Sequence, residues 1–86
     1  MNEYLMRAVV ESVAFFGLCS EETCSEDVAV TQLEQIAAIL KGLKPDEQTR
    51  FRAFTLSLAG QEAASHGDPH RIQFLRSLCD HLGFEG

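Results

Sequence analysis

The residues of this chain best suited to chemistry are three cysteines and three histidines, spread along its 86 positions. A zinc site needs about four Cys or His ligands at close spacing. Cys19 and Cys24 share one segment, whereas Cys79 and His81 lie near the other end. The Cys-x4-Cys spacing matches a zinc site only loosely, and Cys79 and His81 project from different sides of a helix. We therefore predict no metal site and no cofactor.

Two of the histidines belong to one strip of a predicted helix. His70 and His81 share a helix side with Phe74 and Ser77, but they are eleven residues apart in the chain. That separation is about 16 Å along a helix, so the two rings cannot bind one ion. We expect two exposed histidines beside a half-buried Phe74. The alternative is a strip centred on Phe74 that contacts a partner.

Nothing in the chain has the pattern of a catalytic site. Nucleophilic catalysis needs Ser or Cys beside a base, and the sequence has no Gly-rich phosphate loop, EF-hand loop or His-Glu-x-x-His motif. A chain of this length also has little room for a cleft of roughly several hundred Å³. We therefore predict that the protein is not an enzyme.

The odd cysteine count predicts reduced thiols, with Cys79 buried and Cys19 and Cys24 reactive in a loop.

Start and stop signals divide the chain into four helices that position these residues. Asn2, Ser25 and Asp68 are typical N-cap residues, and Pro45 and Pro69 are typical of a first helical position. Gly17, Gly42 and Gly83 lie near the ends of the first, second and fourth segments, and Gly83 followed by Phe84 is typical of a Schellman motif. We predict a single all-α domain (residues 1–86), an antiparallel four-helix bundle with helices at about 2–18, 26–42, 45–65 and 69–82.

The first helix has the broadest apolar surface. Between Tyr4 and Leu18 the apolar arc covers roughly 240°, against the ~100° stripe of a one-sided surface helix. Such a helix must be covered from two directions. The second helix has one main apolar stripe, formed by Ala29, Leu33, Ile36, Leu40 and Leu43. Val28 and Ile39 lie outside this stripe, and we expect them to contact a third element. The largest residues predicted for the core are Phe16, Leu33, Leu40, Phe54, Leu58, Leu75 and Leu82.

Apolar residues outside a single stripe recur in three of the four helices. The third helix has a second face of small residues, and a tight helix contact would explain Gly60 there. A contiguous apolar set usually marks an interface, and the commonest one is a two-fold dimer. We predict a homodimer whose contact residues are Tyr4, Phe15, Leu56 and Phe74.

The net charge of −6 lies in the first half of the chain, where residues 1–47 hold nine acidic and three basic residues. Four of these acids, Glu21, Glu22, Glu26 and Asp27, follow the first helix closely. An acidic chain is repelled by nucleic acid and by anionic membrane, so a basic protein surface is the compatible partner. The first predicted helix is too short and too charged to span a bilayer and is a poor signal peptide. We therefore expect a soluble, cytoplasmic protein.

These observations support two hypotheses for the function of the protein. The first is a small non-catalytic protein–protein interaction module that self-associates. The alternative is an acidic neutraliser or adaptor, comparable in role to an immunity protein or antitoxin, that binds a basic protein. The chain lacks the Asp-Ser-Leu of acyl carrier proteins and the Tyr-Tyr-Pro of colicin immunity proteins.

Overall fold

The computed structural model describes residues 2–84 of the chain. It contains four helices, α1 (Glu3–Leu18), α2 (Glu26–Leu40), α3 (Pro45–Ala64) and α4 (Pro69–His81), and the described residues form no strand. The predicted all-α four-helix bundle is confirmed, and the predicted helix ends differ from the observed ones by two residues at most. No helix within residues 2–84 combines the length and the apolar character needed to cross a membrane.

Three of the four helices begin with a side-chain cap, as predicted. In each, the side-chain oxygen of the N-cap residue accepts a backbone N–H of the first turn: Asn2 at 2.9 Å, Ser25 at 3.3 Å and Asp68 at 2.9 Å. These bonds satisfy donors that have no partner inside the helix. α3 has no side-chain cap and begins with Pro45, which has no N–H to satisfy.

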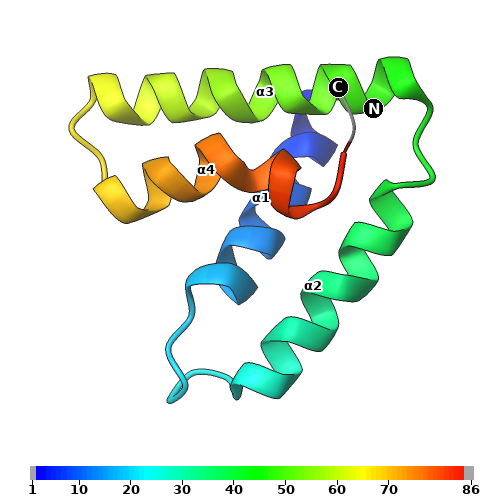
Figure 1. Cartoon of the computed structure of the whole chain (residues 1–86). Helices are drawn as coiled ribbons and strands as arrows, with labels where there is room; N and C mark the ends of the chain where they lie inside the picture. The colour runs from blue at the N-terminus through cyan, green and yellow to red at the C-terminus, as the bar shows by residue number, and fades with distance from the viewer. Residues whose placement is uncertain (1, 85–86) are drawn as a thin grey trace.

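The four helices form two hairpins that cross each other. α3 and α4 pack along one another, and α1 contacts all three other helices, which accounts for part of its broad apolar arc. Within the described residues α2 packs extensively only on α1. Figure 1 shows the α1–α2 hairpin as an arm that projects away from the α3–α4 hairpin. The radius of gyration, 12.7 Å, accordingly exceeds the ~12 Å expected for a compact chain of this length.

The core lies where α1, α3 and α4 meet. Val10, Phe51 and Leu75 have no exposed surface at all, whereas α2 contributes only Ala29 and Leu40 to the buried set. Of the residues predicted for the core, Leu40, Leu58, Leu75 and Leu82 are buried, but Phe16, Leu33 and Phe54 remain partly exposed. Leu33 lies on α2, the helix with the fewest neighbours, and so keeps contact with water.

The end of α4 is a Schellman motif, as the Gly-Phe pair predicts. Gly83 has a φ of 80°, and its N–H donates to the Asp80 carbonyl at 3.1 Å. The N–H of Phe84 donates to the Cys79 carbonyl at 3.0 Å. The Phe84 ring is buried and meets Phe51 edge-on, with 6.0 Å between ring centroids. The motif therefore directs the chain after α4 back onto the core.

The structure changes the interpretation of two glycines. α1 continues through Gly17 to Leu18, so Gly17 is not a stop signal. A Cβ at Gly17 would lie 2.5 Å from two ring atoms of Phe74. The absence of a side chain at Gly17 therefore leaves the space that the Phe74 ring occupies. Apart from the backbone of its own helix, a Cβ at Gly60 would meet no described atom within 4 Å. No tight helix contact therefore explains Gly60 in this fold.

Candidate functional site

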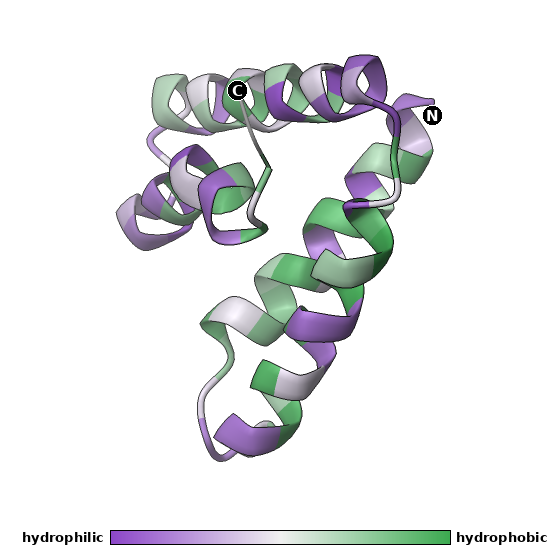
Figure 2. Ribbon diagram, turned by 45° about the vertical axis from the view of Figure 1, so that its right-hand side comes forward, coloured by the Kyte–Doolittle hydropathy of each residue, from purple (hydrophilic) through white to green (hydrophobic). Residues whose placement is uncertain are grey.

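Exposed apolar side chains gather on the α1–α2 hairpin. The two most exposed large ones are Tyr4, at 89%, and Ile39, at 75%. In Figure 2 hydrophobic residues run along both helices of the arm. Seven of the eight large exposed hydrophobic residues in the described chain belong to this hairpin: Tyr4, Leu5, Phe15, Leu18, Val28, Val30 and Ile39.

A groove of about 320 Å³ runs between the two helices of the hairpin. Ala8, Val9 and Ser12 of α1 form one wall, and residues 36, 39 and 40 of α2 form the other. Because an α-helix turns 100° per residue, residues 4, 5, 8, 12 and 15 of α1 share one arc of about 100° beside this groove. We call the whole surface the hairpin face and define it by Tyr4, Leu5, Ala8, Ser12, Phe15, Ile36 and Ile39.

The hairpin face contains no charged side chain. The nearest charges on α1, Arg7 and Glu11, lie at its edge, where Arg7 Nε donates to Glu11 Oε1 at 3.1 Å. Glu11 also accepts a hydrogen bond from Arg71 of α4. The Arg7 and Glu11 side chains remain 54% and 49% exposed, so these charges flank the hairpin face on its Arg71 side and leave the groove side of α1 uncharged.

Arg71 links three helices. Its Nε donates to Glu62 Oε1 of α3 at 2.8 Å, and its Nη2 donates to Glu11 of α1. The hydrogen bond to Glu62 raises the pKa of Arg71; partial burial opposes the shift, and Glu11 adds to it. Partial burial alone would raise the pKa of Glu11, but hydrogen bonds from Arg71 and Arg7 outweigh it and hold that pKa below its usual value.

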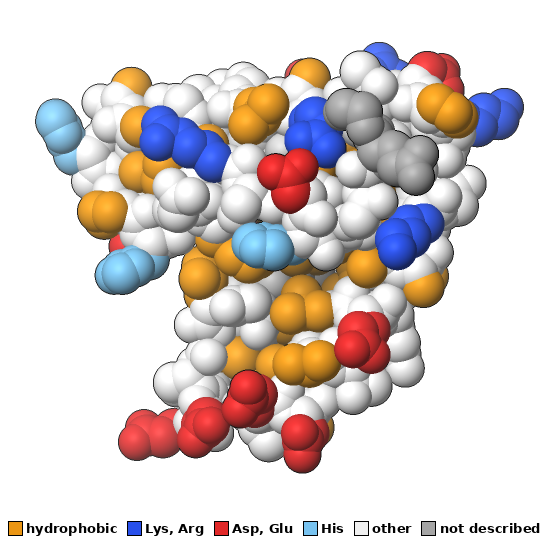
Figure 3. Space-filling model, in the orientation of Figure 1, with side chains coloured by type: hydrophobic (Ala, Val, Ile, Leu, Met, Phe, Trp, Pro, Cys, Tyr) orange, Lys and Arg blue, Asp and Glu red, His pale blue; other side chains and the backbone are white. Residues whose placement is uncertain are grey.

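Residues 19–27, which join α1 to α2 and include the first two residues of α2, close the far end of the hairpin; we call them the acidic loop. Figure 3 shows the red carboxylates gathered at the tip of the arm. Within the described residues no carboxylate of this loop forms an ion pair, so all of its charge faces solvent. The four acids predicted as a partner surface, Glu21, Glu22, Glu26 and Asp27, are all exposed.

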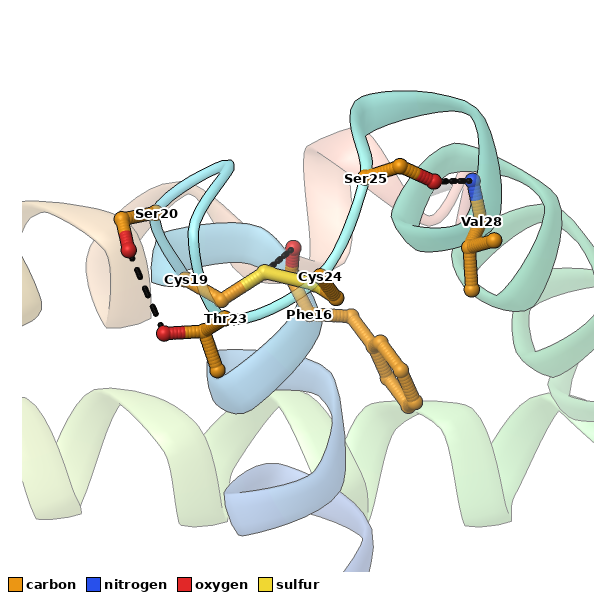
Figure 4. Close-up of a disulfide and its surroundings, with 7 residues drawn as sticks. All are labelled: Phe16, Cys19, Ser20, Thr23, Cys24, Ser25 and Val28. Carbon is orange, nitrogen blue, oxygen red and sulfur yellow. Dashed lines mark hydrogen bonds between the residues drawn. A yellow bond between two sulfur atoms is a disulfide. The ribbon is translucent and has the colours of Figure 1, made fainter.

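A disulfide joins Cys19 to Cys24, so the prediction of two free, reactive loop thiols is wrong. Cys19 is the C-cap of α1, and the turn that follows returns the chain until the two Cα atoms are 6.6 Å apart. The backbone N–H groups of Thr23 and Cys24 both donate to the Ser20 carbonyl and hold this turn. Figure 4 shows the disulfide and a further hydrogen bond between the Ser20 and Thr23 hydroxyls, 3.2 Å apart. The cysteine count therefore no longer supports the cytoplasmic prediction, because disulfides are typical of oxidising compartments.

Cys79 is the remaining thiol, and it is free and buried, as predicted. Burial raises its pKa, although a contact with the Thr55 hydroxyl 3.8 Å away works in the opposite direction. Thr55 is itself buried and donates to the Arg52 carbonyl at 2.9 Å. A neutral thiol in this position is a packing group of the α3–α4 contact.

The four residues predicted as dimer contacts do not form one surface. Tyr4 and Phe15 lie on the hairpin face. Leu56 is exposed on α3, about 140° around that helix from the buried Phe51. Phe74 is half-buried, with its ring over Gly17 between α1 and α4.

Ile39 is the residue whose role was misjudged. The prediction that Val28 and Ile39 contact a third element is wrong, because they are 52% and 75% exposed. Their position outside the main stripe of α2 is compatible with exposed apolar surface. Only the position of α2 at the edge of the fold shows that no other helix covers these two residues.

The histidines do not meet one another or the cysteines. His66, His70 and His81 are all exposed, and residues 2–84 contain no group of three or more Cys, His, Asp or Glu side chains able to hold a metal ion. Comparisons of the chain with protein-family models, curated proteins and solved structures found no match. The surfaces of the α1–α2 hairpin therefore have to be interpreted from their own geometry.

Proposed function

We propose that this protein is a non-catalytic protein–protein interaction module that self-associates through the hairpin face. The observation that supports this proposal is that four of the seven large exposed apolar residues of the hairpin lie on this one face: Tyr4, Leu5, Phe15 and Ile39. A contiguous apolar surface of this kind usually marks an interface. Because the face is uncharged, two chains of net charge −6 are able to meet there without placing like charges in contact.

The shape of the face suits a two-fold contact. Ile39 projects beside a groove whose other wall includes the small residues Ala8 and Ser12. In a two-fold dimer each Ile39 enters the groove of the other copy, since such an interface pairs one patch with itself. Tyr4 and Phe15 extend the contact along α1.

The dimensions of the hairpin are compatible with this contact. α1 has 16 residues. It is therefore about 24 Å long, and two packed helices are about 20 Å wide. The flat footprint is roughly 500 Å², and interlocking side chains bring it toward the ~800 Å² per partner of a standard interface. Asp27 precedes Ile39 by about 18 Å of helix, so the acidic loops lie outside a contact centred on Ile39.

Equilibrium sedimentation at micromolar concentration tests the proposal. We expect a species of twice the 9.5 kDa chain mass, and a return to 9.5 kDa in the Ile39→Glu variant. Leu56→Glu is the matched control, because it makes the same change on an exposed residue of α3 and should leave the dimer intact. A 9.5 kDa species for the unaltered chain contradicts self-association. Dissociation by Leu56→Glu alone contradicts the choice of the hairpin face.

The acidic loop supports the alternative function, a neutraliser or adaptor that binds a basic protein. Its carboxylates are exposed and unpaired within the described chain, as they must be to meet cations of a partner. This alternative predicts a 9.5 kDa monomer in the same sedimentation experiment, so one measurement separates the two functions.

A further inference from the structure

A second hollow lies at the tip of the hairpin, between the last turn of α1 and the first turns of α2. Its volume is about 450 Å³, so the prediction that a chain of this length has little room for a hollow of that size is wrong. Phe16, Ala29, Val30 and Leu33 provide apolar walls, the two disulfide cysteines lie beside them, and Glu21 and Glu26 stand at the rim. Figure 3 shows hydrophobic side chains next to the acidic group at this end of the arm.

This tip hollow is separate from the hairpin face. Val30 and Ile39 are nine residues apart on α2, which places them about 180° apart around the helix. A second copy seated over Ile39 therefore leaves Val30 accessible. The tip hollow is available to a different partner whether or not the chain self-associates.

The walls of the tip hollow are held in place by local interactions. The Cys19–Cys24 disulfide closes the loop, and the Ser25 side chain caps α2 directly after it. Figure 4 shows the disulfide, the Ser25 cap and the Phe16 ring in this region. A preformed apolar hollow loses little conformational entropy when a ligand enters it. Phe16 and Leu33 are partly exposed and would bury further surface on binding.

The charge around the tip hollow selects the partner. Residues 19–27 carry four acids and no Lys or Arg, and no basic residue lines the hollow. We infer that the tip hollow binds a segment of a partner protein in which a large apolar side chain is flanked by Lys or Arg. The apolar side chain enters between Phe16 and Leu33, while the cations meet the carboxylates at the rim. This inference goes beyond self-association and gives the basic partner a defined place on the molecule.

Binding of a fluorescent peptide to the full chain tests the inference. The probe is a short amphipathic peptide of Leu and Lys at helical spacing, measured by fluorescence anisotropy. Two comparison peptides replace every Lys by Glu or every Leu by Gln. We expect both comparison peptides to bind about tenfold more weakly or worse. Equal binding of the Leu→Gln peptide would mean that the acids attract any cation, and would overturn the inference, as would a failure of the Leu–Lys peptide to bind.

Matched variants locate the site. Val30→Asp and Glu21→Lys, which alter the tip hollow, should each weaken the Leu–Lys peptide about tenfold. Val28→Asp and Glu34→Lys make the same changes at exposed positions of α2 that do not line the tip hollow, and should have much smaller effects, with circular dichroism confirming that all four variants fold. Equal losses in the controls overturn the inference. So does dissociation of a dimer by Val30→Asp, because the occupant of the tip hollow is then a second copy. Ile39→Glu should not weaken peptide binding, which separates this test from that of self-association.

Discussion

At the residue scale, the end of α3 shows how one position sets local strain. His66 has a φ of 60°, a left-handed conformation that glycine adopts freely and other residues adopt at a cost. Its N–H donates to the Ala63 carbonyl, and the Gly67 N–H donates to the Glu62 carbonyl at 2.7 Å. This is the Schellman pattern, with histidine where glycine is usual. Gly67 follows His66, so the glycine of this turn lies one residue after the position whose positive φ would favour it.

Replacing His66 with glycine should therefore stabilise the protein. We expect His66→Gly to raise the free energy of unfolding by about 0.5–1 kcal/mol, because the strain is relieved while the unfolded chain gains some freedom. Urea denaturation measures this change. His70→Gly is the control: His70 lies in the first turn of α4, where glycine should lower stability by up to ~1 kcal/mol. A loss of stability in His66→Gly contradicts the assignment.

Gly17 and Gly60 form a second matched pair. Alanine is the better helix former at both positions, but at Gly17 its methyl group would collide with the Phe74 ring. We expect Gly17→Ala to cost about 1–3 kcal/mol and Gly60→Ala to gain about 0.5–1 kcal/mol in chemical denaturation. Adding Phe74→Leu should recover part of the loss at Gly17. If Gly17→Ala is as favourable as Gly60→Ala, the α1–α4 contact is not as described.

At the element scale, charge fixes the relation of three helices. Arg71 is the shared partner of Glu11 and Glu62, and its side chain is only 22% exposed. Such pairs contribute little when they are fully in water, but more when one charge is partly buried and bonded twice. The Arg71 contacts therefore align α4 with both α1 and α3 along one edge of the hairpin face.

Removing Arg71 should weaken this alignment in a pH-dependent way. We expect Arg71→Met to lower the free energy of unfolding by about 1 kcal/mol at neutral pH, and Arg76→Met, on an exposed residue of the same helix, to change little. Because the pKa of Glu11 is lowered in the folded state, its stabilisation is present above the ordinary value of 4.5 and is lost as the pH falls through the lowered pKa. Unfolding measured at several acidic pH values should show a smaller decline in Arg71→Met. An equal decline in both proteins contradicts the role of the pair.

At the scale of the whole molecule, the four helices are not equally supported. α3 and α4 pack along each other and on α1, whereas α2 has one extensive contact in the described chain. Leu33 and Ile36, in the middle of its apolar stripe, are only partly buried. Regions with few buried contacts open locally at a lower free energy than the core. The hairpin that carries both candidate surfaces therefore includes the least stable element of the fold.

Hydrogen exchange should reveal this difference. We expect amides in the middle of α2, around Leu33, to exchange faster than those around Thr55 in α3. The experiment is best made on the Ile39→Glu variant, because self-association would protect α2. Equal protection of the two helices in that variant would show that α2 is held as firmly as the core.

The sequence by itself determined the helices and most of their ends. Caps at Asn2, Ser25 and Asp68, the proline at the start of α3 and the Gly83–Phe84 motif are all correctly placed from residue types alone. Each depends on hydrogen bonds or dihedral preferences that extend over only a few residues. Patterns that extend over only a few residues can be recognised in the sequence before the packing of the helices is known. The buried stripe of α4 followed from the same reasoning, because its period is a property of the helix.

Only the tertiary structure decided which stripes meet and which remain open. The Arg71–Glu11 bond joins residues 60 positions apart, and the space that Gly17 leaves for Phe74 depends on how α1 crosses α4. The Cys19–Cys24 disulfide depends on the path of a loop. The exposure of Ile39 depends on α2 lying at the edge of the fold. Helical periodicity gives the direction of a side chain around its own axis but not the position of the neighbouring axis. For that reason the candidate surfaces emerged only when the helices were placed relative to one another.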